Sequence, residues 1–214
     1  METQFAQLLP GSGRIAPPRE LVESAHVKDY DTYYESVMAD LEGYWGRVAR
    51  EEVNWFRPFE KVVEGDGPNA RRFLGGKCNI CHNALDRHAD GQRRNKVALI
   101  WLGEDGEERI FTYAMLRRQV ARLAGGLKQL GVQKGDRVVI YMPLTPEGIM
   151  AMLACARIGA VHSVVYAGLG AGALRKRIED AGAKVVLCAD VGYRRGRRVD
   201  LKAIVDEAVE GNPQ

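Results

Sequence analysis

The chain has 214 residues, of which 46% are hydrophobic and 28% charged, enough for one sizeable globular core and a small appendage. Its 31 basic and 28 acidic residues leave a formal net charge of +3. This balance argues against a nucleic-acid binder with a wholly basic surface but allows a local anion site. No apolar run approaches the roughly 18 residues of a membrane span, and no secretory signal pattern opens the chain. With four cysteines expected to be reduced, we predict a cytoplasmic α/β protein that binds neither nucleic acid nor membrane.

The first region, residues 1–94, is irregular and rich in aromatic residues, proline, glycine and charge. Two short helices are predicted there. One begins after Asp29, a good N-cap residue, and the other covers Leu41 to Glu52. The many large aromatic side chains favour a segment that packs onto a neighbouring core.

The second region, residues 95–214, has regular periodicity. A hairpin is predicted from strands 97–102 and 109–111, and Thr112 then caps a long amphipathic helix that closes at Gly131. Three strand–helix units follow, with strands at 137–142, 161–166 and 184–189 and helices at 146–157, 171–181 and 201–209. Short apolar strands alternating with helices predict a partial parallel, doubly wound α/β sheet. The sequence stops where another strand is expected, so something should cover that sheet edge.

Cys78-Asn-Ile-Cys81-His82 matches the pattern of covalent c-type haem attachment. Two thiols would form thioether links and the histidine would ligate iron. The alternative is an incidental pair of thiols, which we favour because haem attachment accompanies export and so short a pattern is weakly specific.

Gly168-Leu-Gly170-Ala-Gly-Ala173 fits a dinucleotide-binding turn between a predicted strand and a predicted helix, and Asp190 ends the next predicted strand. Glycines there would let backbone N–H groups approach a pyrophosphate. The alternative is an ordinary tight turn, because dinucleotide folds usually place this unit first in the sheet.

Arg194-Arg195-Gly196-Arg197-Arg198 is a basic loop before a helix whose predicted N-cap is Asp200. Guanidinium groups present planar, permanently charged forks to phosphate, and the loop lies where ligands of open α/β sheets gather. The alternative is a solvated basic loop. The residues by themselves indicate an anion-binding α/β domain and go no further.

Longer segments, in order along the chain, resemble the AMP-forming acetyl-CoA synthetase family from about Pro17 to the end. Gly75-Gly-Lys-Cys-Asn79 and Asn83-Ala-Leu-Asp-Arg-His88 resemble its glycine–lysine–asparagine and aspartate–arginine–histidine signature. The other matching segments are Phe111 to Leu116, Lys134 to Val138, Ile140 to Pro143, Pro146-Glu147, Ala151 to Val165, Arg177 to Asp180, Lys184 to Val186, Asp190 and Leu201 to Ala208.

The resemblance implies the N-terminal portion of a ligase that joins acetate and CoA. ATP and the carboxylate give an acyl-adenylate and pyrophosphate, and the CoA thiol then releases AMP and acyl-CoA. Arg194 and Arg197 match the family's arginine–x–glycine–arginine loop, with Arg195 and Gly196 between them, and this implies binding of the CoA phosphates. Gly168 matches a glycine-rich turn near the CoA path, although the family's serine or threonine at the next helix start is replaced here.

The resemblance also implies what this sequence does not contain. The family's ATP and Mg²⁺ sites and its acyl pocket lie in later residues, so we expect residues 1–94 to form the N-terminal segment and 95–214 to begin the AMP-binding domain. The chain alone should be inactive, with no catalytic or metal-binding residue, and a C-terminal complementing part is the expected partner besides CoA. A propionyl-CoA or other short-chain synthetase, a non-catalytic interaction module and a nicotinamide-binding enzyme remain the alternatives.

Overall fold

The computed structural model describes residues 16–211, and these form two compact units. Unit 1 comprises residues up to 52 together with 61–72, and unit 2 comprises 53–60 and the chain from 73 onward. The packing of the aromatic N-terminal segment onto a neighbouring core, and the boundary at residue 94, stay predictions.

Unit 1 contains more regular structure than its sequence predicts. Both predicted helices are present, and the Asp29 side chain caps the first by accepting from the backbone N–H groups of Asp31 and Thr32. The Gly46 position allows the second helix to approach Val62, because a Cβ there would lie 3.0 Å from a Val62 methyl group. The elements are α2 (Arg19–Ser24), α3 (Tyr30–Ala39), α4 (Leu41–Glu52), β1 (Lys61–Glu64) and the 3-10 turn η1 (Gly67–Asn69). Strand β1 pairs with β2 (Arg71–Leu74), of which only Arg71 and Arg72 belong to unit 1.

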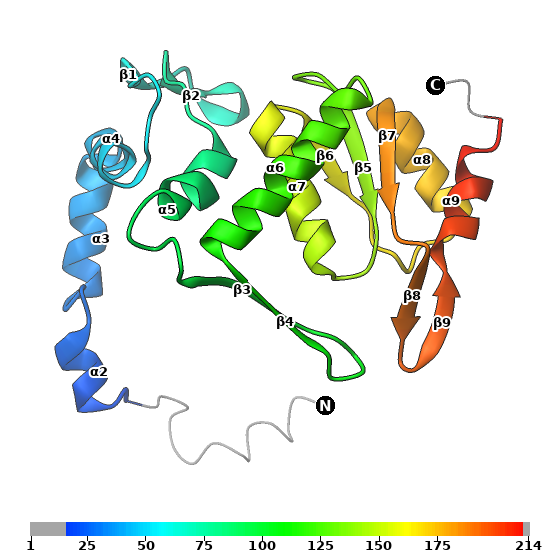
Figure 1. Cartoon of the computed structure of the whole chain (residues 1–214). Helices are drawn as coiled ribbons and strands as arrows, with labels where there is room; N and C mark the ends of the chain where they lie inside the picture. The colour runs from blue at the N-terminus through cyan, green and yellow to red at the C-terminus, as the bar shows by residue number, and fades with distance from the viewer. Residues whose placement is uncertain (1–15, 212–214) are drawn as a thin grey trace, which may run out of the picture. The chain divides into compact units, whose positions relative to one another are not determined.

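Unit 2 is built on a three-stranded parallel sheet in the order β6-β5-β7, as the strand–helix alternation predicts (Figure 1). Its strands are β5 (Arg137–Tyr141), β6 (Val161–Val164) and β7 (Ala183–Cys188). Two antiparallel hairpins accompany it, β3 (Val97–Leu102) with β4 (Glu108–Thr112) and β8 (Val191–Arg194) with β9 (Arg197–Asp200).

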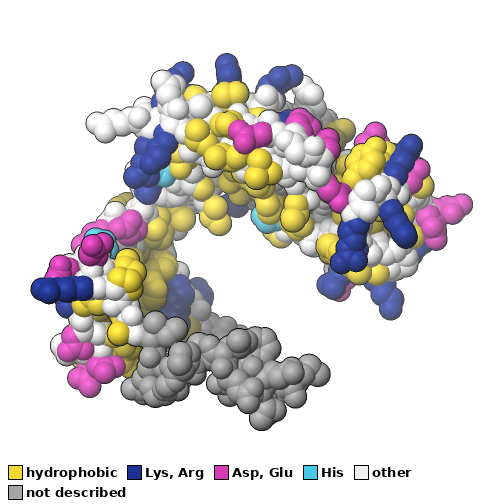
Figure 2. All heavy atoms as spheres, turned by 90° about the horizontal axis from the view of Figure 1, so that it is seen from below, with side chains coloured by type: hydrophobic (Ala, Val, Ile, Leu, Met, Phe, Trp, Pro, Cys, Tyr) yellow, Lys and Arg dark blue, Asp and Glu magenta, His cyan; other side chains and the backbone are white. Residues whose placement is uncertain are grey.

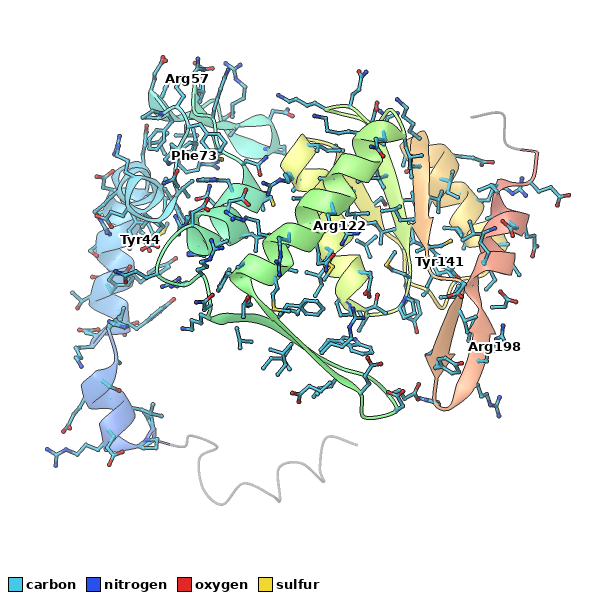
Figure 3. All side chains as sticks on the ribbon, viewed as in Figure 1. Tyr44, Arg57, Phe73, Arg122, Tyr141 and Arg198 are labelled. Atoms are coloured by element: carbon cyan, nitrogen blue, oxygen red, sulfur yellow. The ribbon has the colours of Figure 1, made fainter. Side chains whose placement is uncertain are left out.

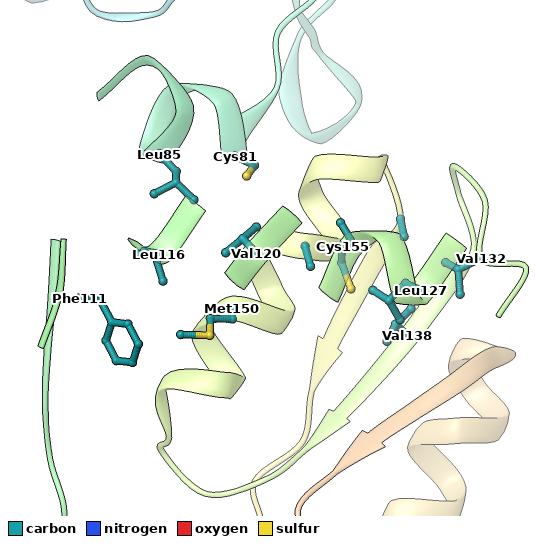
Figure 4. Close-up of a cluster of buried hydrophobic side chains, with 13 residues drawn as sticks. Cys81, Leu85, Phe111, Leu116, Val120, Leu127, Val132, Val138, Met150 and Cys155 are labelled. Carbon is teal, nitrogen blue, oxygen red and sulfur yellow. The ribbon is translucent and has the colours of Figure 1, made fainter. Parts of the chain in front are cut away.

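Helices cover both faces of this sheet, as in a doubly wound fold (Figure 1). Successive side chains of a strand point to opposite faces, so β5 contributes Val138 to one hydrophobic cluster and Val139 and Tyr141 to the other. The first cluster includes Leu116, Val120 and Met150 (Figure 4). The helices are α6 (Tyr113–Gln129) and α7 (Pro146–Ile158) on the first face, and α8 (Ala171–Ala181) and α9 (Leu201–Val209) on the second.

The predicted helix boundaries of unit 2 are confirmed by their caps. Thr112 accepts from the Met115 N–H at the start of α6. After α6, Gly131 has a φ of 81°, and the Val132 N–H donates to Leu127 O at 3.0 Å, which is the hydrogen bond of a Schellman motif. Asp200 caps α9 through the Ala203 N–H, as its sequence position predicts.

The aspartate–arginine–histidine segment forms the π-helix η2 (His82–Asp86) and the short α5 (Arg87–Ala89), which the sequence did not predict. It is joined to α7 by polar contacts. Arg157 donates to both carboxylate oxygens of Asp86 at 2.7 and 2.9 Å, and the Asn79 amide donates to Ala156 O at 2.8 Å. The same amide donates to Arg157 O at 3.4 Å, which is one of the last carbonyls of α7 and lacks a partner within the helix. These signature residues join the segment 79–86 to the C-terminal end of α7.

Candidate functional site

A pocket of about 890 Å³ opens beyond the carboxyl ends of the parallel strands of unit 2. This is the edge at which open α/β sheets bind their ligands. Four stretches of chain supply its walls: 101–107 from the β3–β4 hairpin, 143–145 after β5, 166–170 after β6, and part of 191–204. The pocket therefore joins segments that lie about a hundred residues apart in the sequence.

The basic segment that we predicted as a loop is a β-hairpin. β8 and β9 pair in the register Arg194 with Arg197, which leaves Arg195 and Gly196 as a two-residue turn. Both turn residues have positive φ, 52° and 72°, as a type I′ turn requires. Glycine adopts this conformation readily and arginine does so rarely, so the turn places Arg195 in a mildly strained backbone state.

This register brings Arg194 and Arg197 together. Residues directly opposite on antiparallel strands share a face and lie within about 5.5 Å at their Cβ atoms. Two like charges so placed repel each other, and a bound polyanion would relieve that repulsion. Within residues 16–211 neither arginine forms an ion pair with a carboxylate. The Arg194 guanidinium instead lies 5.7 Å from the centre of the Tyr166 ring, a cation–π contact.

The predicted site residues have different positions relative to the pocket. Arg194 and Gly196 line it, whereas Arg195 and Arg197 are exposed on the hairpin outside the lining. Arg198 pairs with Tyr193 in the adjacent register position, and neighbouring positions of a strand point to opposite faces. Arg198 projects from the hairpin in Figure 3 and does not line the pocket.

The predicted glycine-rich turn forms the wall that follows β6. Gly170 is the N-cap of α8 and, having no side chain, provides no side-chain cap. A Cβ on Gly168 would lie 2.3 Å from the Tyr166 ring, so glycine leaves room for that ring.

A buried tyrosine, absent from the sequence prediction, holds this turn. The Tyr141 hydroxyl donates to Leu169 O at 2.6 Å and has Ala167 O at 3.3 Å. Its ring is fully buried (Figure 3), and burial raises the pKa of its hydroxyl above the usual value of 10.0, so the group remains a donor at neutral pH.

The acidic loop between β3 and β4 is the other part that sequence reasoning missed. Glu104, Asp105 and Glu107 line the pocket, and a Glu104 carboxylate oxygen accepts from the Gly196 N–H at 3.0 Å. The Trp101 indole N–H donates to Leu144 O at 2.7 Å. The one signal in the sequence was an acidic run in a predicted turn, and nothing in it indicated a backbone N–H partner in the basic segment 92 residues away.

Two of the four cysteines, Cys81 and Cys155, are buried in the first hydrophobic cluster. Cys81 is fully buried in the first hydrophobic cluster, where a thioether link to haem would require unpacking the core, and burial raises its pKa. Burial likewise raises the pKa of Cys155 to about 11. Across residues 16–211, no three His, Cys, Asp or Glu side chains gather so as to hold a metal ion, and no helix combines the length and apolar character that crossing a bilayer demands.

Two family models together match most of the chain. Residues 85–213 match the model described as AMP-binding enzyme, and residues 30–84 match the model described as acetyl-coenzyme A synthetase N-terminus. The chain belongs to the AMP-binding enzyme family. It corresponds to the N-terminal part of acetyl-CoA synthetases, as the ordered resemblance predicts.

Curated relatives agree with this assignment. An acetyl-coenzyme A synthetase of Chlorobaculum tepidum is 45% identical over 98% of this chain and 32% of its own length. A 3-hydroxypropionyl-coenzyme A synthetase of Sulfurisphaera tokodaii is 48% identical over 86% of this chain and 28% of its own length. The chain thus spans about a third or less of these relatives.

A solved structure supports the fold. Acetoacetyl-CoA synthetase from Streptomyces lividans superposes with a TM-score of 0.80 at 31% identity, over 90% of this chain and 30% of that one. The predicted α/β adenylate-forming fold is therefore confirmed.

Proposed function

We propose that this chain supplies the CoA-phosphate site of an acetyl-CoA synthetase, whose complete reaction converts ATP, acetate and CoA into acetyl-CoA, AMP and pyrophosphate. Arg194, Arg195, Gly196 and Arg197 bind the phosphates of the 3′-phospho-ADP end of CoA. The observation that carries the proposal is the register of the hairpin, which sets Arg194 opposite Arg197, with Arg194 in the pocket lining. Two adjacent guanidinium groups without acidic partners suit a ligand that carries several phosphates.

The role of these residues is to bind and orient CoA rather than to perform chemistry. Adenylate formation needs groups that hold the ATP phosphates and offset developing negative charge. We assign neither the ATP site nor a Mg²⁺ site to residues of this chain, and we expect it to be inactive alone. ATP–pyrophosphate exchange that depends on acetate, catalysed by this polypeptide without additions, would contradict that expectation.

Calorimetric titration of the chain with CoA tests the site directly. Arg194→Ala removes a charged hydrogen-bond donor from the pocket and should weaken CoA binding by about tenfold or more. Arg198→Ala, which removes the same charge from outside the pocket lining, is the matched control and should have a much smaller effect. Raising the salt concentration should weaken binding to the wild-type chain. Equal losses in the two variants would contradict the assignment.

In a complete enzyme the same substitution should separate the two half-reactions. Arg194→Ala should raise the CoA concentration required for acetyl-CoA formation and leave acetate-dependent ATP–pyrophosphate exchange nearly unchanged. An equal loss of both half-reactions would count against the CoA role.

The expected partner is a C-terminal complementing part of the synthetase. Apolar side chains of unit 2 remain open to solvent, among them Leu144 at 96%, Leu102 at 69%, Ile100 at 57% and Val164 at 56% exposure. Apolar side chains also lie open on the face of the molecule drawn in Figure 2. Exposed apolar surface of this kind marks interaction sites. Activity restored by adding a C-terminal fragment would support this partner, and a stable complex without activity would favour a non-catalytic interaction module instead.

The acyl substrate is a short-chain carboxylate. Acetate is favoured by relatives named acetyl-coenzyme A synthetase, and 3-hydroxypropionate is the second candidate because two relatives are 3-hydroxypropionyl-coenzyme A synthetases. Exchange assays of the complemented enzyme with acetate, propionate and 3-hydroxypropionate would rank them. A cytoplasmic location remains a prediction from the sequence.

A further inference from the structure

The turn of the β8–β9 hairpin carries backbone donors that the strand ladder does not use. In a two-residue hairpin the ladder closes at the flanking pair, here Arg194 and Arg197. The N–H groups of the two turn residues therefore take no part in the ladder. Arg194 and Arg197 flank the turn, so it combines positively charged residues with hydrogen-bond donors outside the ladder.

One of these donors is already occupied. The Gly196 N–H donates to a carboxylate oxygen of Glu104 at 3.0 Å, and Glu104 and Gly196 both line the pocket. Glu104 belongs to the β3–β4 loop, so the contact joins two segments on the rim of the pocket. A carboxylate and a phosphate offer such a donor the same kind of negatively charged oxygen. An anionic ligand of the hairpin must therefore compete with Glu104.

Other acidic side chains of the loop do not share this position. The Asp105 carboxylate accepts from the Glu107 N–H at 3.1 Å and thereby stabilises its own turn. Glu107 lines the same pocket and is exposed, and it carries the same charge as Glu104. Comparing Glu104 with Glu107 therefore separates the effect of direct contact with the Gly196 N–H from the effect of a nearby negative charge.

We propose that Glu104 competes with the phosphates of CoA at this site, because its carboxylate occupies the Gly196 N–H until a phosphate group displaces it. This inference rests on the proposed function. A ligand that engages both arginines and the turn recovers what the displaced carboxylate loses, whereas a ligand with one phosphate recovers less. Glu104 thus lowers the affinity of the hairpin for every ligand whose phosphate takes the Gly196 N–H.

Calorimetry with CoA and with AMP, on the full chain and on two exposed-site variants, tests this. Glu104→Ala should tighten CoA binding by about three- to tenfold, the range expected when one competing hydrogen bond is removed, and should tighten AMP binding as well. Glu107→Ala removes the same charge without touching Gly196 and should change the affinity for CoA less than about twofold. A gain of affinity cannot arise from misfolding.

A ligand-free readout separates this inference from the proposed function. The amide proton resonance of Gly196 should shift in unliganded Glu104→Ala and stay in place in Glu107→Ala. CoA binding that is unchanged or weaker in Glu104→Ala, or tightened equally in both variants, overturns the inference while the CoA site stands. If neither the wild type nor Glu104→Ala binds CoA, both the inference and the proposed function fail. CoA binding by Glu104→Ala alone supports the inference.

Discussion

Arginine side chains meet two different environments in unit 2, at the Asp86–Arg157 pair and at the β8–β9 hairpin. Arg157 and Asp86 are 30% and 15% exposed and form two hydrogen bonds between them. Arg194 is exposed and has an aromatic ring beside it. The first arginine is neutralised within the fold, whereas the second keeps its charge available. Family signature residues thus include some that stabilise the scaffold and others that suit a ligand.

The physical difference is one of desolvation. A charge that is largely removed from water needs a partner, and removing that partner leaves an uncompensated charge in the protein. A charge at an exposed rim remains solvated and costs little when unpaired. Substitutions should therefore affect stability at the first site and ligand binding at the second.

The largest effect on stability is expected at the scaffold pair. Asp86→Ala should lower the free energy of unfolding by about 2–3 kcal/mol, because Arg157 loses both carboxylate hydrogen bonds in a partly desolvated position. Urea unfolding measures the change. The double variant Asp86→Ala with Arg157→Met should recover part of the loss, and no recovery would indicate that Asp86 acts through other contacts.

A smaller loss is expected where the scaffold supports the pocket. Tyr141→Phe removes the hydroxyl that donates to Leu169 O and should cost about 1 kcal/mol. Amide hydrogen exchange at residues 167–170 should accelerate more than exchange in β5. Uniform acceleration across unit 2 would show that the hydroxyl stabilises the whole core rather than the turn.

Turn substitutions in the hairpin should act locally. Gly196→Ala places a Cβ at a φ of 72° and should destabilise the hairpin by about 1 kcal/mol, seen as faster exchange in β8 and β9. Arg195→Asn is the opposite test, because asparagine favours the first position of a type I′ turn, and it should slow that exchange. The global unfolding midpoint should hardly change in either variant. A large shift in the midpoint would show that the hairpin, like the Asp86–Arg157 pair, contributes to the stability of the whole unit.

The smallest expected effect is a pH dependence at the surface. The Gln133 N–H donates to the Asp136 carboxylate, and Lys184 Nζ lies 3.1 Å from it. These contacts lower the pKa of Asp136 below the usual 3.8. A carboxylate with a lowered folded-state pKa stabilises the protein above its unfolded pKa and loses that contribution as pH falls through the folded value. Asp136→Asn should therefore flatten the fall in stability below about pH 4, with the exposed Asp180→Asn as control.

Much of unit 2 was predictable from the sequence because its signals are local. Alternating apolar strands and amphipathic helices, Thr112 and Asp200 as N-caps and Gly131 as a helix end depend on neighbouring residues alone. Apart from the β8–β9 hairpin, which was predicted as a loop, the strands and helices between residues 95 and 211 agree with the structure to within about two residues. The irregular region was harder, and β1, β2 and the π-helix η2 carry no comparable periodic signal.

The candidate site likewise has a part that was predictable from the sequence and a part that was not. The residue types and order in the sequence determined the basic segment Arg194 to Arg197 and its resemblance to a CoA-binding loop. Tertiary structure alone decided that this segment is a hairpin, that Arg194 and Gly196 line a pocket, and that Tyr141 and Glu104 contact its walls. The reason is distance along the chain. Strand register, burial and a hydrogen bond between Glu104 and Gly196 arise only when folding brings remote segments together, and no local pattern encodes such a contact.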